Sequence, residues 1–363
     1  MRKLRVGFIG SGGITELHYP AYKDNPKAEL YAICDSDEDQ LSERAAEWGI
    51  ERTYTDYREL LDNPDIDAVE IITPHHLHCE MGVAALEAGK HVSMQKPPAI
   101  NVAECDTLIE AASRSDKVFR VFENFQYYPP MAKAKELLDS GAIGEPLSIR
   151  IKCVQGKTGK GGEIPYRRWA WRFDPAQSGG GRVIFDYGYH LFSIARWYLG
   201  EIEKVFSWIT YRPIQYGWIL DSPAVAIWKY KDGEKYGSYE VISSDDMLVQ
   251  SKTLVKGRKG RAEDEWVELS GSRGFLWITR CTTNLLDRPP LIMYRDGVTT
   301  EYSNMPADWG SSFIAGINDF IDGIIEGRQV RQSGEEGKLV LQICRAIQLS
   351  AKEGREVSPE EIV

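Results

Sequence analysis

A glycine-rich turn near the start of the chain constrains the fold more than any other feature. An apolar run over 4–9 leads into a cluster of glycines, and apolar residues at helical spacing follow. This order predicts a strand, a tight turn and a helix. Such a turn suits a pyrophosphate, because glycines let the backbone approach closely while the N–H groups of the new helix face the charge. We expect the pyrophosphate to be held by Gly10, Gly12, Gly13 and Ile14.

An acidic residue supports this interpretation. A second apolar run, 29–34, ends in Asp35, about where dinucleotide-binding units place the acid that binds the adenosine ribose. A carboxylate there accepts hydrogen bonds from both ribose hydroxyls and repels a 2′-phosphate. Ser36 follows, where an arginine would suit a phosphorylated cofactor. The cofactor predicted is therefore NAD. Thr15 stands in place of the third glycine of the pattern, which predicts looser packing of the helix on the strand.

The composition is that of an ordinary globular protein with room for two cores. Of 363 residues, 42% are hydrophobic and 27% are charged, and the net charge of −10 argues against a nucleic-acid-binding surface. No signal segment or membrane-length apolar run is apparent, so we expect a cytoplasmic protein that does not bind membranes. The six cysteines lack paired spacing, which predicts reduced thiols. The histidines at 75, 76 and 78 lack the spacing of a zinc site, and no metal is expected.

The first third of the chain alternates short strands with longer helices. Strands are expected at 4–9, 29–34, 67–72, 91–94 and 118–122, and helices near 14–23, 38–48, 77–89 and 101–115. This alternation predicts parallel strands joined by right-handed crossovers, hence an α/β Rossmann domain with a doubly wound parallel sheet. We place this NAD-binding domain at residues 1–126.

Beyond residue 126 the hydrophobic periodicity changes. A helix is expected near 131–139, and alternating strands at 147–155, 204–211, 224–231, 236–243, 264–270, 274–280 and 291–295. Strands joined by short turns predict an α+β domain over 127–363 with a large, mostly antiparallel open sheet. Amphipathic segments at 311–327 and 334–353 predict closing helices that can pack back on the first domain.

Polar residues follow two strands of the predicted Rossmann sheet, at the edge where such sheets bind ligands. Lys96 is either a cation that stabilises an alkoxide-like oxygen beside the nicotinamide or a solvated loop lysine. Pro97 and Pro98 stiffen the loop, which favours a placed side chain. The residues expected around the nicotinamide are Thr73, Pro74, His75, His78, Gln95 and Lys96.

A glycine-rich segment, 156–177, combines arginines with tryptophans. Flat aromatic faces suit the axial C–H groups of a sugar ring, and guanidinium groups suit its oxygens. The alternative is an arm that packs its tryptophans against a neighbouring subunit, and both interpretations stay open. The substrate residues expected here are Arg168, Trp169, Trp171 and Arg172, with Tyr127 reaching the same pocket.

Three glycines, 179–181, lead into a helix on which Asp186 and His190 share one face, because they are four residues apart. Histidine takes a proton near neutral pH, and a neighbouring carboxylate can orient it and hold its charge. Such a pair is more often a structural hydrogen bond. The glycines, and a nicotinamide site that lacks a proton acceptor, favour catalysis here.

Together these residues resemble the Gfo/Idh/MocA family of glucose-fructose oxidoreductases and inositol dehydrogenases, across essentially the whole chain. The likeness rests on Gly10-x-Gly12-Gly13-Ile14, Asp35, Thr73-Pro74-x-x-x-His78, Lys96-Pro97, the segment 124–129, and Gly179-Gly180-Gly181 followed by Asp186-x-Gly188-x-His190. The resemblance implies bound NAD, an open-sheet domain for substrate binding and oligomerisation, a homo-oligomer, and a pyranose, glycoside or cyclitol substrate. It also implies that Lys96 is the active-site lysine and that Asp186 and His190 are the acid and histidine pair.

The chain departs from the family pattern at four positions. Gln95 stands where a glutamate usually precedes the lysine, which removes a negative charge beside Lys96. His75 replaces an asparagine, Gln126 replaces an arginine, and Ser193 replaces an acid in the helix of the aspartate and histidine pair. None of these changes removes a predicted catalytic residue.

The sequence therefore predicts NAD-dependent oxidation of a secondary ring hydroxyl of a sugar, glycoside or cyclitol. His190 would accept the hydroxyl proton, the hydride would pass to nicotinamide C4 and Lys96 would stabilise the oxyanion. Asp186 would position His190 and a neighbouring hydroxyl, so Asp186 and His190 are also expected to contact the substrate. Two alternatives stay open. One is a glycosidase or lyase that retains NAD and oxidises the sugar transiently, and the other is a non-catalytic sensor of NAD and sugar. The intact catalytic set counts against the sensor, since binding alone does not require it.

Overall fold

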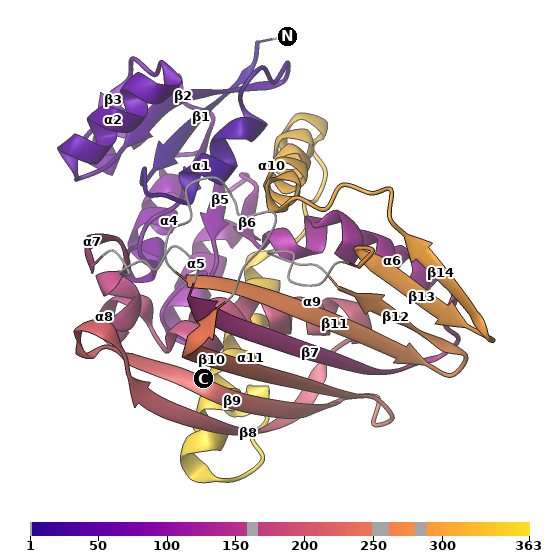
Figure 1. The fold of residues 1–363 in the computed structure, drawn as a ribbon. Helices are drawn as coiled ribbons and strands as arrows, with labels where there is room; N and C mark the ends of the chain where they lie inside the picture. The colour runs from indigo at the N-terminus through magenta and orange to yellow at the C-terminus, as the bar shows by residue number, and fades with distance from the viewer. Residues whose placement is uncertain (1, 158–165, 249–260, 280–287) are drawn as a thin grey trace. The chain divides into compact units, whose positions relative to one another are not determined.

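The computed structural model describes residues 2–157, 166–248, 261–279 and 288–363 (Figure 1). The chain divides into two compact units, each built from three segments. The first unit comprises Met1–Glu123, Asp174–Gly180 and Phe313–Leu341, and the second comprises Asn124–Phe173, Gly181–Ser312 and Gln342–Val363. No helix among the described residues has the length and apolar character needed to span a bilayer.

A six-stranded parallel sheet forms the core of the first unit. Its strands are β1 (Leu4–Ile9), β2 (Ala28–Cys34), β3 (Thr53–Tyr54), β4 (Ala68–Ile71), β5 (His91–Gln95) and β6 (Phe119–Phe122). They lie in the order β3-β2-β1-β4-β5-β6, and every pairing is parallel. The order reverses between β1 and β4, which is where doubly wound sheets bind ligands. The predicted Rossmann architecture is confirmed.

The helices of the first unit begin where capping residues stand. Asp37 caps α2 (Glu38–Trp48) and Asn101 caps α5 (Val102–Ser113), each by accepting a hydrogen bond from the backbone N–H three residues on. The other helices of this unit are α1 (Thr15–His18), η1 (Tyr19–Ala21), α3 (Tyr57–Leu61), η2 (His75–Leu77), α4 (His78–Glu87), α8 (Pro175–Ser178) and most of α10 (Trp309–Glu326). The single helix predicted at 14–23 forms as α1 and η1, because the ring of Pro20 has no N–H to continue an α-helix.

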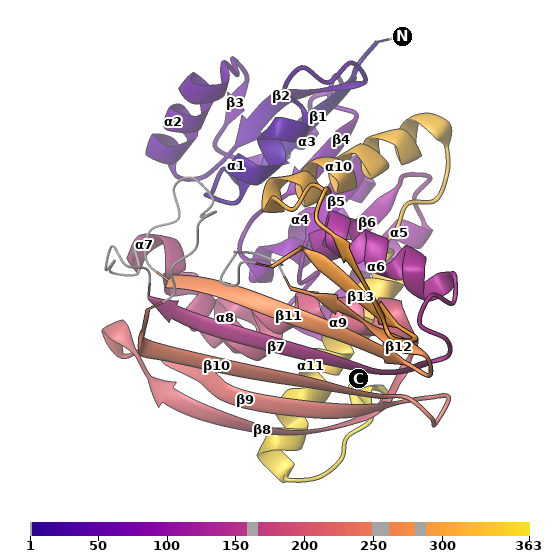
Figure 2. The same cartoon turned by 45° about the vertical axis from the view of Figure 1, so that its right-hand side comes forward.

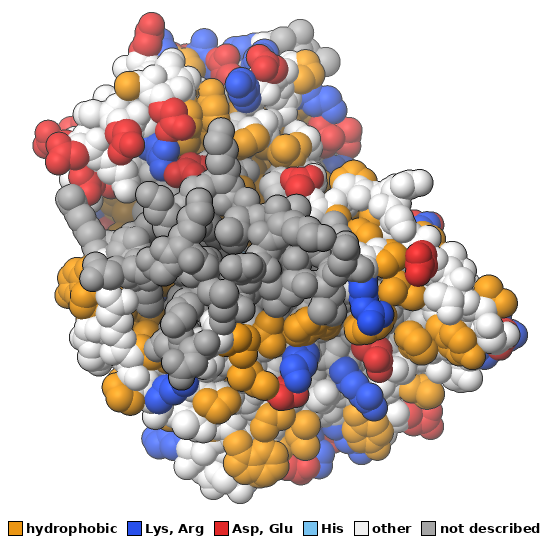
Figure 3. Space-filling view, viewed as in Figure 1, with side chains coloured by type: hydrophobic (Ala, Val, Ile, Leu, Met, Phe, Trp, Pro, Cys, Tyr) orange, Lys and Arg blue, Asp and Glu red, His pale blue; other side chains and the backbone are white. Residues whose placement is uncertain are grey.

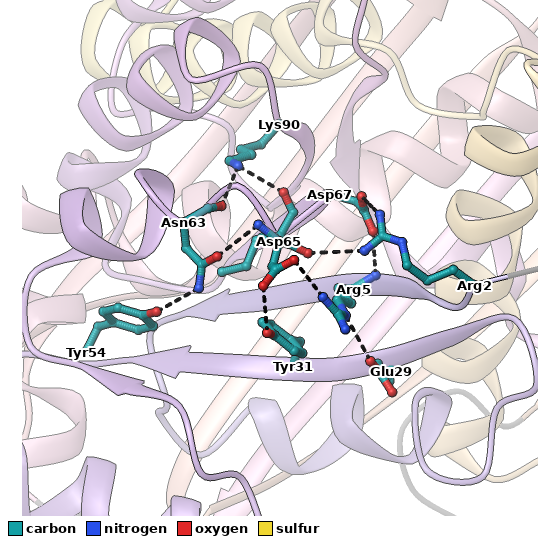
Figure 4. A network of polar contacts seen from close by, with 10 residues as sticks. Arg2, Arg5, Glu29, Tyr31, Tyr54, Asn63, Asp65, Asp67 and Lys90 are labelled. Atoms are coloured by element: carbon teal, nitrogen blue, oxygen red, sulfur yellow. Dashed lines mark hydrogen bonds and ion pairs between the residues drawn. The ribbon is translucent and has the colours of Figure 1, made fainter.

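A network of polar side chains lies at the amino ends of these parallel strands (Figure 4). Asp67 accepts hydrogen bonds from Arg5 N at 2.8 Å and from Arg2 Nη2 at 2.5 Å. The buried Lys90 donates to the carbonyl oxygens of Asn63 at 2.8 Å and Ile66 at 2.9 Å. In doubly wound sheets ligands bind at the carboxyl ends of the strands, which is the opposite edge from this network.

An eight-stranded sheet dominates the second unit (Figure 2). Its strands are β7 (Pro146–Lys157), β8 (Ile202–Pro213), β9 (Ile219–Tyr230), β10 (Tyr236–Leu248), β11 (Arg261–Gly271), β12 (Gly274–Ile278), β13 (Leu291–Arg295) and β14 (Val298–Tyr302). The order is β14-β13-β12-β11-β7-β10-β9-β8, and the pairing of β7 with β10 is parallel while the others are antiparallel. The predicted large, mostly antiparallel sheet is confirmed.

One face of this sheet is covered by helix α9 (Gly188–Leu199), which lies behind the strands in Figure 2. Phe192 of α9 makes edge contacts with the rings of Trp228 and Tyr239. The other helices of the second unit are η3 (Asn124–Tyr127), α6 (Pro129–Asp139), α7 (Tyr166–Trp169), η4 (Ala170–Phe173), η5 (Arg182–Tyr187), η6 (Gln215–Gly217), the end of α11 (Gly334–Glu353) and η7 (Pro359–Glu361).

The opposite face of the eight-stranded sheet carries large hydrophobic side chains in solvent. Trp208, Ile227 and Tyr236 are 60%, 46% and 56% exposed. Hydrophobic groups alternate with lysines and arginines over this face in Figure 3. Exposed hydrophobic side chains that gather on one face are typical of a surface that meets another protein.

Candidate functional site

The glycine turn after β1 is shaped for close approach to a ligand. Gly10 has φ of +98°, and a Cβ atom there would lie 2.5 Å from the carbonyl oxygen of Ile72, so only glycine fits. At Gly12, by contrast, no described heavy atom lies within 4 Å of such a Cβ. Gly13 completes the turn and Ile14 stands at the N-cap of α1. The turn therefore has an open side where a pyrophosphate fits.

Asp35 lies beside this turn and is held in place by donors from the protein itself. Its Oδ2 accepts hydrogen bonds from Ser11 N at 2.7 Å and Ser11 Oγ at 2.9 Å. Gln40 Nε2 donates to the same oxygen at 3.0 Å, and Asp37 N donates to Oδ1 at 3.0 Å. The charge, its orientation and the neighbouring turn fit the ribose of NAD. Sequence reasoning missed Ser11 and Gln40, although Ser11 lies inside the glycine motif.

Thr15, which replaces the third glycine, is fully buried. Its hydroxyl donates to the Gly12 carbonyl oxygen at 2.5 Å. The Thr15 side chain thus bonds the first residue of α1 to the backbone of the glycine turn.

His78 joins the two strand ends that were predicted to border the nicotinamide. Its Nδ1 lies 2.8 Å from the Pro97 carbonyl oxygen and its Nε2 lies 3.0 Å from the Thr73 carbonyl oxygen. Burial lowers the pKa of His78 from 6.5 to about 4, and the Lys96 cation adds to this effect. His78 is therefore neutral at physiological pH, and as a neutral imidazole it donates to only one of these two carbonyl oxygens. It lies between the segments that carry Thr73 and Lys96.

His75 lies in η2, directly after Pro74 at its N-cap, and is buried. Its Nδ1 lies 2.8 Å from the carbonyl oxygen of Ser178. Gln95 ends β5, and its amide oxygen accepts a hydrogen bond from Lys96 N at 2.9 Å. Ring nitrogens of both predicted histidines thus lie within hydrogen-bond distance of backbone oxygens. Cofactor contacts by these residues stay predictions.

In the second unit, the glycines at 179–181 lead into a π-helix rather than an α-helix. The turn η5 spans Arg182–Tyr187, and Asp186 N donates to the Gly181 carbonyl oxygen at 3.1 Å. The α-helix that carries His190 begins only at Gly188. The expectation of one regular helix through Asp186 and His190 was wrong, because the wider π-turn carries Asp186. Such turns are frequent at functional sites.

Asp221, a residue from a distant strand, accepts hydrogen bonds from the start of this turn. Asp221 of β9 is 2% exposed, and its carboxylate accepts hydrogen bonds from Val183 N and Ile184 N, each at 2.8 Å. A Cβ atom at Gly181 would lie 2.1 Å from Asp221 Oδ2, so the third glycine of the triplet is needed for this approach. Burial raises the pKa of Asp221, although the two N–H donors and Arg182 oppose the shift. Sequence reasoning missed Asp221, since nothing local marks it.

Asp186 forms the centre of a cluster of arginines and tryptophans. It is 3% exposed, and its Oδ2 lies 3.4 Å from Arg172 Nε and 3.6 Å from Arg182 Nη1. The Arg172 guanidinium lies 4.3 Å from the ring centroid of Trp171 and 5.2 Å from that of Trp169. The structure therefore brings four predicted residues together and adds Arg182, whose guanidinium lies 5.1 Å from the Trp169 ring. 

The side chain of Arg168, also predicted to bind substrate, lies outside the described part of the chain. Its backbone belongs to α7.

His190 is enclosed by aromatic rings. It stacks on Phe125, with the ring centroids 4.5 Å apart and the planes at 18°. Trp309 and Tyr187 meet it edge-on, with centroids at 6.4 Å and 6.1 Å. This packing fixes the plane of the imidazole, as a proton acceptor requires. The predicted Tyr127 is also buried, two residues beyond Phe125 in η3.

Two family models match the chain. The model described as "Oxidoreductase family, NAD-binding Rossmann fold" matches residues 4–123, and the "GFO/IDH/MocA C-terminal domain" matches residues 131–276. The chain belongs to the Gfo/Idh/MocA family. It is accordingly an oxidoreductase, and its cofactor is NAD.

Characterised relatives of this Gfo/Idh/MocA protein span almost its full length. Levoglucosan dehydrogenase of Pseudarthrobacter phenanthrenivorans is 29% identical over 389 residues, covering 97% of both chains. Myo-inositol 2-dehydrogenase of Thermotoga maritima is 29% identical over 371 residues, covering 99% of this chain and 100% of its own. A solved levoglucosan dehydrogenase in complex with NADH and levoglucosan superimposes with a TM-score of 0.80 at 26% identity, covering 98% of this chain and 99% of its own.

Proposed function

We propose that this protein oxidises a secondary ring hydroxyl of a sugar, glycoside or cyclitol with NAD. The observation that carries the proposal is the second-unit cluster, in which Asp186 lies between two arginines and beside tryptophan faces, four residues before His190. Arginine guanidinium groups suit the hydroxyls of a carbohydrate ring, and the flat faces of tryptophan rings suit its C–H faces. The two relatives named as levoglucosan and myo-inositol dehydrogenases support the same substrate class.

The first unit holds the cofactor in this proposal. Bound NAD supplies a hydride acceptor at nicotinamide C4. The open glycine turn holds the pyrophosphate and Asp35, already oriented by Ser11, accepts the ribose hydroxyls. The residues that border the nicotinamide are Thr73, Pro74, His75, His78, Gln95 and Lys96.

The protein's own side chains handle the proton and the developing charge. His190 accepts the hydroxyl proton at a ring nitrogen, since a neutral imidazole is a base near neutral pH. Its stacking on Phe125 holds the imidazole in one plane for this step. Asp186 stabilises the resulting imidazolium, and Lys96 stabilises the substrate oxygen as it becomes negative. Trp169, Trp171, Arg168, Arg172 and Tyr127 bind and orient the ring.

The domain division and the assembly belong to the same proposal. Residues 1–126 form the NAD-binding domain, and 127–363 form the domain for substrate binding and oligomerisation. A homo-oligomer is supported by the exposed hydrophobic face around Trp208, Ile227 and Tyr236. We also expect the protein to work in the cytoplasm.

The experiment is an absorption spectrum of the purified protein, followed at ~340 nm, where reduced nicotinamide absorbs. Levoglucosan, myo-inositol and a panel of pyranosides are added, first without and then with free NAD. A rise with free NAD indicates a dissociating dehydrogenase, and a rise without it indicates retained cofactor. No rise under either condition, from protein that binds NAD, would contradict the proposal.

A further inference from the structure

A chain of hydrogen bonds runs through the core of the first unit to the backbone of Lys96. Glu70 of β4 and His18 of α1 are each 1% exposed, and Glu70 Oε2 lies 2.5 Å from His18 Nδ1. His18 Nε2 lies 3.0 Å from Gln95 Nε2, and Gln95 Oε1 lies 2.9 Å from Lys96 N. Three buried or half-buried side chains from different elements thus connect a carboxylate to one peptide N–H.

The chemistry of each atom sets the direction of these bonds. Lys96 N–H is a donor, so Gln95 presents its oxygen to it and turns its NH₂ group toward His18. His18 Nε2 must then accept, which leaves Nδ1 to carry the proton and donate it to the Glu70 carboxylate. Every group in the chain is satisfied in one arrangement, with Glu70 ionised and the imidazole neutral.

The surroundings of His18 reinforce this arrangement. The rings of Phe8, Phe122 and Phe313 pack edge-on around the imidazole, with centroids 6.2, 5.4 and 5.1 Å away. Tyr22 donates its hydroxyl to Glu70 Oε1. Burial raises the pKa of Tyr22, Glu70 raises it further, and the Arg120 cation opposes the shift. Charged or titratable groups near His18 in the described part of the chain thus include Glu70, Tyr22 and Arg120.

Arg120 is itself fully buried and belongs to the same core. It donates from Nε to Ser93 Oγ at 3.0 Å and from Nη1 to the Gly316 carbonyl oxygen at 2.6 Å. Its positive charge partly balances the negative charge of Glu70, while Arg120 takes part in none of the hydrogen bonds between Glu70, His18, Gln95 and Lys96.

We propose that Glu70, His18 and Gln95 are positioning residues, which hold the Lys96 backbone in place through a neutral imidazole and an uncharged amide. The proposal rests on the role of Lys96 in the proposed function. The N–H of Lys96 is thus bonded to an uncharged amide, and the Glu70 carboxylate lies at the far end of the hydrogen-bond series, beyond His18. Small displacements of a catalytic group are costly, since a shift of about 1 Å lowers rates by roughly 100-fold.

Two variants break the chain while they preserve volume. Gln95→Met removes both bonds of the amide, and His18→Phe keeps the aromatic packing but removes both bonds of the imidazole. We expect each to lower kcat roughly 10- to 100-fold. His18→Phe changes a residue outside the set that borders the nicotinamide, so it should leave NAD affinity nearly unchanged. His91→Phe is the matched control, because His91 begins the same strand and accepts a backbone hydrogen bond from Val118 N at 2.9 Å. It should lose stability but keep kcat.

A Lys96→Met background separates this inference from the proposed function. If Lys96→Met alone keeps full turnover, the proposed role of the lysine fails. If Lys96→Met is inactive while Gln95→Met and His18→Phe keep wild-type kcat, the positioning role fails and the proposed function stands. Non-additive losses in the Gln95→Met/Lys96→Met double variant, measured by sensitive single-turnover assays, would support action through the lysine.

Nitrogen-15 NMR of the imidazole gives a readout that packing alone would not move. The His18 signal, assigned by its loss in His18→Phe, should show a neutral ring protonated at Nδ1. In Gln95→Glu a carboxylate faces Nε2, so the ring should become an imidazolium at the same pH. An Nε2-protonated or charged ring in the wild type, or an unchanged neutral ring in Gln95→Glu, would overturn the proposal.

Discussion

The amide of Gln126 donates a hydrogen bond to Ser193 Oγ at 3.1 Å, and both side chains are buried. These are two of the four positions where the chain departs from the pattern of its family, which has an arginine and an acid there. A neutral pair therefore stands where the family pattern has two charges. The two departures lie in contact, one in η3 and the other in α9, so they form one structural change.

This contact predicts strong coupling between substitutions. Gln126→Arg buries a cation and Ser193→Asp buries a carboxylate, so each alone should destabilise the protein by about 3 kcal/mol. The double variant pairs the charges and should recover about 2 kcal/mol of the summed loss. Urea unfolding of the four proteins measures this coupling. Additive losses would show that the two sites do not share one interaction.

Asp221 should control both stability and turnover through the π-turn. Asp221→Ala leaves the Val183 and Ile184 N–H groups without an acceptor in a buried site, which should cost roughly 2 to 5 kcal/mol. The same change releases the turn that carries Asp186, so kcat should fall. Asn101→Ala, which removes the cap of α5, is the control and should cost about 1 kcal/mol with no loss of kcat. Equal effects of both variants on kcat would refute a specific role for Asp221.

The stability of the protein should fall in mild acid because of His78. In the folded state its pKa is about 4, whereas the ordinary value is 6.5. Below pH 6.5 His78 therefore binds a proton in the unfolded chain but not in the native protein. The free energy of unfolding falls with pH until about pH 4. This single group accounts for up to about 3 kcal/mol. Unfolding free energies of wild type and His78→Gln across this range should converge toward the acid side, and parallel curves would contradict the assignment.

Two buried thiols should resist alkylation. Burial raises the pKa of Cys34 and of Cys105 to about 12, and neighbouring acids add to the shift. At a pH of about 8 neither thiol forms the reactive thiolate. Mass spectrometry after iodoacetamide treatment should find both unmodified in the native protein and modified in urea. Rapid labelling of the native protein at either position would show that the thiol is accessible.

The periodicity of the sequence was sufficient to predict the two sheets, but not to predict every strand in them. Five of the six Rossmann strands have apolar runs, whereas β3 has only two residues, Thr53 and Tyr54, and gives no pattern. The β14 strand was also missed, because its exposed Val298–Tyr302 segment lacks an apolar face.

The candidate site shows a similar division. Glycines, Asp35, Lys96, Asp186 and His190 stand in recognisable local patterns. Asp221 and Glu70 act on segments 38 and 52 residues away in the chain, so no local pattern could reveal them. Asp221 also accepts hydrogen bonds from the first N–H groups of the π-turn, whereas the apolar period of the sequence predicts a helix without distinguishing its type.

The central claim is that a ring carbon of the substrate gives its hydride to NAD. The most direct measurement uses a sugar or cyclitol that the protein oxidises, deuterated at the carbon that bears the reacting hydroxyl. Mass spectrometry of the reduced cofactor should find one deuterium per molecule, and kcat should fall relative to the unlabelled substrate if hydride transfer limits the rate. Reduced cofactor without deuterium would contradict the account.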